Sequence, residues 1–246
     1  MRVAIVVFPG SNCDYDCFKA LTDVMGAEAY YVWHREHDLK NPDAVILPGG
    51  FSYGDYLRAG AIARFSPVMN EVIEFANAGG PVLGICNGFQ MLCEAHLLPG
   101  ALVRNESLKY IGHAVTVRVE NNETMYTNAY EKGQVVTYHV AHGMGNYVAT
   151  PDTIRQLEAE ERVIFRYVTP EGQAKPEANP NGAMNNIAGI INERGNVLGL
   201  MPHPERAVEA ILGSTDGVGL FESMRKFIED GVAVRGEPVR QLAGVR

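Results

Sequence analysis

Short apolar runs alternate with helix-forming stretches through the first half of the chain. Three such runs are rich in aliphatic and aromatic residues, namely residues 3–8, 29–33 and 44–47. Runs of this length and composition predict strands buried on both faces of a parallel sheet. Residues 14–25 and 67–78 are predicted to be helices, and each is followed directly by glycine. The alternation predicts a doubly wound α/β domain, whose ligands bind at the carboxyl ends of its strands.

The pattern changes in the middle of the chain, where helix signals are weak. Three segments there are rich in β-forming residues, namely residues 115–119, 134–140 and 163–167. They predict half-exposed antiparallel strands. Residues 169–186 are rich in Pro, Gly, Asn and Ala, and predict an irregular loop.

Two further strands, residues 187–191 and 197–201, and a helix over residues 218–228 complete the predicted elements. We therefore expect one α/β domain over residues 1–230. It should have a mostly parallel central sheet, helices on both faces and additional antiparallel strands. Residues 231–246 are expected to form a C-terminal tail.

Composition and charge exclude several classes of function. The 246 residues carry a formal net charge of −8 and no run of Lys or Arg, which disfavours a nucleic-acid partner. The apolar runs are too short for a membrane span or a signal peptide. Four cysteines are too few for a disulfide scaffold in a chain of this length, which favours free thiols. We expect a cytoplasmic protein.

One cysteine stands between two glycines at the end of an apolar run. Cys86 has Gly84 two residues before it and Gly88 two residues after it. A strand that turns sharply into a helix crowds its backbone, so only glycine fits at these two positions. The pattern predicts an exposed apex side chain that faces the positive end of the following helix, which favours a thiolate. Cys86 is therefore a candidate nucleophile.

A candidate base follows a late strand. Pro204 biases His203 towards an extended backbone, in which residues two apart project to the same side. Glu205 is thus expected to reach one imidazole nitrogen of His203 while the other nitrogen faces a thiol, as in a nucleophile–base–orienter triad. The alternative is a rigid surface turn with no catalytic role.

Two backbone N–H groups are candidates for an oxyanion hole. One is that of Asn87, directly after the nucleophile, and the other lies in the glycine turn that contains Gly50. Cys13 and Cys17 have the spacing of a metal pair on a helix, but no second pair matches them. Buried thiols are the favoured interpretation, and we expect no metal site.

These motifs together resemble those of the class I (triad) glutamine amidotransferases. The resemblance is carried by Pro48-Gly49-Gly50, by Gly84-x-Cys86-x-Gly88-x-Gln90 and by His203-Pro204-Glu205. It implies a flavodoxin-like fold and a Cys86–His203–Glu205 triad that hydrolyses glutamine to glutamate and ammonia. It further implies that Gly50 and Asn87 stabilise the oxyanion and that Gln90 contacts the substrate.

Three longer segments resemble the glutaminase subunit of a complex in purine biosynthesis. They are residues 8–14, 50–58 and 201–207. The resemblance implies a synthetase subunit, which binds ATP, Mg²⁺ and formylglycinamide ribonucleotide, and a small accessory subunit. This chain has neither a phosphate loop nor a dinucleotide fingerprint, so no cofactor is expected on it. It departs from the family at Met144, where an acidic residue is expected.

Two other classes of function stay open from the sequence. One is a different cysteine-elbow α/β enzyme, peptidase-like or redox-sensing, which uses the thiol without a glutamine pocket. The other is a non-catalytic regulatory subunit. The presence of Cys86, His203 and Glu205 together disfavours a regulatory subunit, because such a subunit needs none of the three.

Overall fold

The computed structural model describes residues 1–230, so the expected tail, residues 231–246, lies outside the described residues. The strands are β1 (Arg2–Val7), β2 (Glu28–Trp33), β3 (Ala44–Leu47), β4 (Val82–Ile85), β5 (Ala101–Val103), β6 (Ile111–Val119), β7 (Val135–His142), β8 (Asn146–Val148), β9 (Val163–Tyr167), β10 (Ile187–Ile191) and β11 (Val197–Leu200). The α-helices are α1 (Asp14–Lys19), α2 (Pro67–Asn77), α3 (Asn87–Glu94), α4 (Pro151–Ala159) and α5 (Val218–Asp230).

Nine strands form one mixed sheet in the order β2-β1-β3-β4-β11-β10-β9-β6-β7. The pairs from β2 to β11 are parallel, and the pairs from β11 to β7 are antiparallel. Strands β5 and β8 form a separate two-stranded sheet. The predicted parallel core with added antiparallel strands is therefore confirmed.

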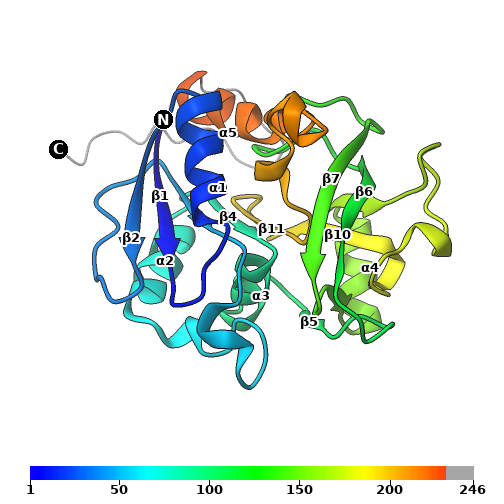
Figure 1. Ribbon diagram of the computed structural model, residues 1–246, viewed down its shortest axis with the longest axis horizontal. Coiled ribbons are helices and arrows are strands. Elements are labelled where there is room, and N and C mark those ends of the chain that lie inside the picture. Colours follow the sequence, from blue (N-terminus) through cyan, green and yellow to red (C-terminus); the bar gives the residue numbers. More distant parts are fainter. Residues whose placement is uncertain (231–246) are drawn as a thin grey trace.

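The helices lie on both sides of the parallel strands. The chain moves outward from β1 to β2 through α1 but in the opposite direction from β3 to β4 through α2, so right-handed crossovers put these helices on opposite faces. Figure 1 shows α1 beside α5, with α2 and α3 on the other side. No helix within residues 1–230 is long and apolar enough to cross a membrane.

Two helical predictions need correction. The helix expected over residues 14–25 is α-helical only to Lys19 and continues as a π-helical turn, Ala20–Val24. The expectation of weak helix signals in the middle of the chain is wrong at α4. Thr150 caps α4 by accepting a hydrogen bond from the Thr153 N–H, and Pro151 occupies the first helical position. Both are local helix-start signals.

A buried tyrosine hydroxyl connects the start of β4 with the start of β11. The hydroxyl of Tyr126 lies 2.9 Å from the Val82 carbonyl oxygen and 2.6 Å from that of Asn196. Val82 begins β4, and Asn196 directly precedes β11. The side chain is fully buried, so this contact joins the two strands inside the core.

The glycine after the β4–α3 turn lets α3 approach the sheet closely. A Cβ atom on Gly88 would lie 2.0 Å from the carbonyl oxygen of Leu47, at the end of β3. No side chain fits in that space, because the neighbouring atom belongs to the backbone of a buried strand.

Gly88→Ala should therefore destabilise the protein by about 3 kcal/mol, since α3 must move away from β3 to relieve the clash. Gly143→Ala is a matched control, because a Cβ atom there meets nothing within 4 Å. Urea denaturation of both variants measures the difference. Equal stability of the two variants would contradict this account of α3 packing.

Candidate active site

Cys86 occupies the turn between β4 and α3 in a strained backbone conformation. Its φ is +51° and its ψ is −102°, a region that side-chain-bearing residues rarely adopt. A Cβ atom on Gly84 would lie 2.7 Å from the backbone of Gly88. The backbones at these two glycines therefore pass too close to each other for a side chain to fit between them. The predicted elbow is confirmed.

The side chain of Cys86 is not exposed, which corrects the sequence-based expectation. Its relative exposure is 4%, and its thiol lies 3.8 Å from the carbonyl oxygen of Ala141 in β7. The glycine pattern around Cys86 specifies only the turn between β4 and α3. The antiparallel part of the sheet brings β7 over the apex and covers the thiol.

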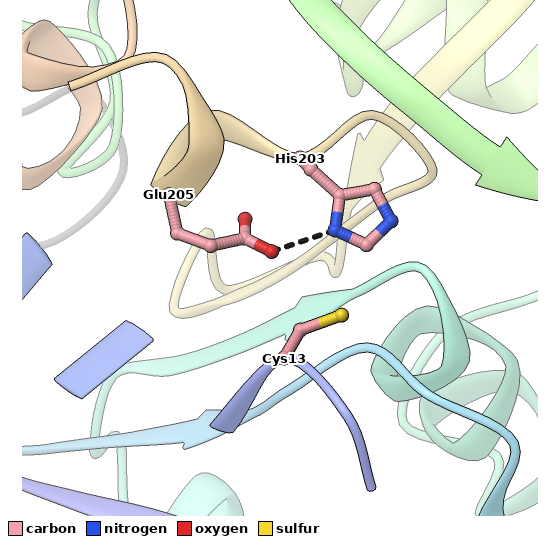
Figure 2. A group of neighbouring side chains, drawn as sticks. All are labelled: Cys13, His203 and Glu205. Carbon is pink, nitrogen blue, oxygen red and sulfur yellow. Dashed lines mark hydrogen bonds and ion pairs between the residues drawn. The ribbon is translucent and has the colours of Figure 1, made fainter. Parts of the chain in front are cut away.

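His203 and Glu205 form a buried pair beside this elbow. His203 Nδ1 lies 2.6 Å from Glu205 Oε1, and the dashed line in Figure 2 marks this contact. The backbone differs from the prediction, because Pro204–Arg206 form a 3₁₀ turn rather than an extended segment. The turn still directs both side chains to one side. A hydrogen bond of 2.8 Å from the His203 N–H to the His139 carbonyl oxygen holds this segment against β7.

The surroundings of His203 favour its charged form. Burial alone lowers the pKa of this imidazole, but the carboxylate of Glu205 and the neighbouring thiols of Cys13 and Cys86 outweigh burial and hold the pKa well above its usual value. Its Nε2 has no hydrogen-bond partner within residues 1–230. The pair can therefore hold an imidazolium next to the Cys86 sulfur, and Nε2 is free to exchange a proton.

Cys13 is a second thiol at the site that sequence reasoning did not place there. It directly precedes α1 and is buried, and Arg206 Nη2 donates a hydrogen bond of 3.0 Å to its sulfur. A Cβ atom on Gly49 would lie 2.7 Å from His203 Cε1 and 3.0 Å from Cys13 Sγ, so both side chains rest over this glycine. Burial raises the pKa of Cys13. Its position after β1, at the carboxyl edge of the sheet, was the available signal.

The two candidate oxyanion donors lie on segments that a hydrogen bond joins, Gly50 in the turn after β3 and Asn87 as the first residue of α3. The Ser52 N–H, two residues after Gly50, donates to the Asn87 side-chain oxygen at 3.0 Å. Gly50 has a φ of +149°, and a Cβ atom there would lie 2.8 Å from the Asn12 nitrogen. This position therefore requires glycine. The oxyanion roles of Gly50 and Asn87 remain predictions.

Gln90 is buried, and both the nitrogen and the oxygen of its side-chain amide form hydrogen bonds within the protein. Its Nε2 donates to the Met144 carbonyl oxygen at 2.7 Å, and its Oε1 accepts from the Asn87 side chain at 2.8 Å. Gln90 thus holds the loop that contains Met144 against α3. Its predicted contact with a substrate remains a prediction.

Asn105 holds the same loop from the other side. Its side-chain nitrogen donates to the His142 carbonyl oxygen at 2.9 Å, and its oxygen accepts from the Gly145 N–H at 2.9 Å. Burial lowers the pKa of His142 to about 4, which keeps this ring neutral near pH 7.

A cavity of about 590 Å³ borders the His203–Glu205 pair on the side of α1. Its lining includes Asp16, His139, Glu205 and Arg206. Charged residues of both signs therefore line this space, and Glu205, which binds His203, is one of them.

Comparisons with known proteins identify the family of the chain. Residues 1–228 match the family described as the CobB/CobQ-like glutamine amidotransferase domain. The phosphoribosylformylglycinamidine synthase subunit PurQ of Chlorobaculum tepidum is 61% identical over 224 residues, which are 91% of this chain and 96% of that protein. The same subunit of Moorella thermoacetica is 55% identical over 231 residues, 94% of this chain and 98% of that protein.

A solved structure of PurLQS from Thermotoga maritima has the same fold over nearly the whole chain. The TM-score is 0.83 at 44% sequence identity, and the match covers 93% of this chain and 99% of that chain. The resemblance predicted from the three motifs is therefore confirmed. The chain belongs to the CobB/CobQ-like glutamine amidotransferase family, and it is similar over most of its length to the PurQ subunits of phosphoribosylformylglycinamidine synthase.

Proposed function

We propose that this chain is the glutaminase subunit of a phosphoribosylformylglycinamidine synthase. It hydrolyses glutamine to glutamate and ammonia. A synthetase subunit uses the ammonia and ATP to convert formylglycinamide ribonucleotide to formylglycinamidine ribonucleotide in de novo purine (IMP) biosynthesis. The observation that carries the proposal is the buried His203–Glu205 pair beside the Cys86 elbow, in a chain 61% identical to a PurQ subunit.

The first half of the reaction forms a thioester. Cys86 Sγ transfers its proton to His203 Nε2 and attacks the side-chain amide carbon of glutamine. The N–H groups of Gly50 and Asn87 stabilise the tetrahedral oxyanion, and two such donors contribute several kcal/mol. His203 then returns the proton to the leaving nitrogen, the carbon–nitrogen bond breaks, and ammonia departs.

The second half releases glutamate. His203 Nε2 takes a proton from water, and the resulting hydroxide attacks the thioester carbon. The carbon–sulfur bond breaks, and the proton on His203 restores the Cys86 thiol. Glu205 keeps Nδ1 protonated and stabilises the imidazolium in both halves, which is the role of the orienting carboxylate in a triad.

The partners follow from the same proposal. The PurLQS structure of Thermotoga maritima, whose PurQ-like chain is 44% identical, supports a complex with a synthetase subunit and a small accessory subunit. ATP and Mg²⁺ bind to the synthetase subunit, and this chain carries no cofactor for the glutaminase reaction. Glutamine is its substrate, and the cytoplasm is its proposed location. Neither a nucleic acid nor a membrane is a partner.

Cys86→Ala should reduce glutamate release from glutamine to background, because no other thiol at the site occupies the elbow. Cys93→Ser, a change of a buried thiol in α3, is the matched control and should retain activity. Circular dichroism and co-purification with the synthetase subunit should show intact folding and binding for both variants. Glutamate release by Cys86→Ala would overturn the mechanism.

Glu205→Gln should lower kcat by about 100-fold or more, because the neutral amide no longer stabilises the imidazolium. Glu205 raises the pKa of His203, so its loss should lower that pKa. The reaction needs the imidazolium as proton donor, and the alkaline limb of the kcat profile should therefore move to lower pH. A pH–rate profile measures this shift. An unmoved limb would exclude Glu205 as the orienting group.

Glutamate release should rise by at least about tenfold when the synthetase subunit, its accessory subunit and their substrates are added, since uncoupled hydrolysis would waste glutamine. The measurement is the glutaminase rate of the purified chain with and without these partners. Bovine serum albumin at equal mass serves as the control addition. Equal rates would contradict coupling but leave the Cys86 chemistry intact.

A further inference from the structure

Three side chains with metal-binding atoms meet beside the proposed nucleophile. One ligand atom from each of Cys13, His203 and Glu205 lies within 4.8 Å of the other two, and all three residues are buried. Figure 2 shows the Cys13 sulfur directed towards the His203 ring, with the Glu205 carboxylate on the ring's Nδ1 side. Thiolate, imidazole and carboxylate together form the donor set that suits Zn²⁺ and Co²⁺.

One carboxylate oxygen in this cluster has no partner. Glu205 Oε1 contacts His203 Nδ1, whereas Glu205 Oε2 is buried and has no hydrogen-bond partner within residues 1–230. A buried charged oxygen without a partner is costly and rare. An ion bound to Oε2 would satisfy this oxygen.

The local charges match a divalent ion. Arg206 contacts Cys13 Sγ at 3.0 Å and Asp16 at 3.0 Å, so the guanidinium lies beside the thiol and favours its deprotonation on metal binding. The thiolate, Glu205 and Asp16 then carry three negative charges against one positive charge on Arg206. The net charge of −2 equals that needed to neutralise a divalent cation.

A cavity borders the Glu205 side of the cluster. The cavity of about 590 Å³ on the α1 side is lined by Asp16, Glu205 and Arg206, which belong to or contact the cluster. The cavity therefore ends next to Glu205, whose side chain is buried.

We propose that Cys13, His203 and Glu205 form an inhibitory site for a thiophilic divalent cation such as Zn²⁺. The ion takes the place of the proton on His203 Nδ1 and binds the unpartnered Glu205 Oε2, and Cys13 Sγ is its third protein ligand. This site departs from the sequence-based expectation of no metal. It shares His203 and Glu205 with the glutaminase reaction, which itself uses no ion.

The inhibition follows from the chemistry of imidazole. A neutral imidazole has one N–H group, so an ion on Nδ1 forces the hydrogen onto Nε2. Nε2 then cannot accept the proton of Cys86, and thioester formation stops. This consequence rests on the proposed function, whereas ion binding itself does not.

The test measures ion binding and inhibition on the full-length chain. Zn²⁺ affinity is measured by competition with a chromophoric chelator, and Co²⁺ reports thiolate ligation through its charge-transfer absorption. Cys13→Ser should weaken Zn²⁺ binding about 100-fold and abolish that absorption. Cys86→Ala should retain both, and Cys93→Ser is the matched control for loss of a buried thiol. Cys13→Ala gives a second variant at the site, and circular dichroism checks the folding of each.

The inhibition arm uses glutamate release with the synthetase subunit present. Zn²⁺ should inhibit the wild type and Cys93→Ser equally, and Cys13→Ser should need about 100-fold more ion, each compared with its own rate without metal. Binding lost in Cys86→Ala but retained in Cys13→Ser would place the ion on the nucleophile and overturn the proposal. Absence of binding to the wild type would also overturn it. Binding in Cys86→Ala does not depend on turnover, so failure of the glutaminase mechanism is distinguishable from failure of the ion site.

Discussion

The parallel pairing of β4 with β11 is the contact on which the rest of the site depends. Ile85 lies opposite Leu200 in register, and the Cys86 N–H donates to the Leu200 carbonyl oxygen at 2.8 Å. The two strands therefore end side by side, which brings the segment that carries His203 next to the nucleophile. A shift of one residue would turn each side chain of the strand to the opposite face and separate the two groups.

The antiparallel part of the sheet covers the groups that this pairing brings together. β7 covers the Cys86 thiol with Ala141 and binds the His203 backbone through His139. Burial on this side weakens screening by water, so the carboxylate of Glu205 acts strongly on the imidazole and outweighs the cost of desolvation. The parallel core thus supplies the positions of the reacting groups, and the added strands supply their low-dielectric surroundings.

Most of the fold could be predicted from local patterns, and the exceptions have physical reasons. The parallel strands of the first half, the elbow and the strands β10 and β11 were predicted within one or two residues, but β2 is an edge strand and largely exposed rather than buried on both faces. Helix α4 was missed although Thr150 and Pro151 mark its start, because it is only nine residues long and lies between segments rich in β-forming residues. For the site, the His203–Glu205 contact was predicted from spacing, but the burial of Cys86 was not, since the strand that covers it lies far along the chain.

The sequence by itself determined the cysteine elbow and the histidine–carboxylate spacing, because the need for glycine at a crowded turn and the reach of nearby side chains are local properties. Only the tertiary structure decided that Cys13 lies against His203 and that Gln90 binds the Met144 loop. These contacts join segments that follow different strands. The order of strands in the sheet determines which segments meet at its carboxyl edge, and no local pattern of residues specifies that order.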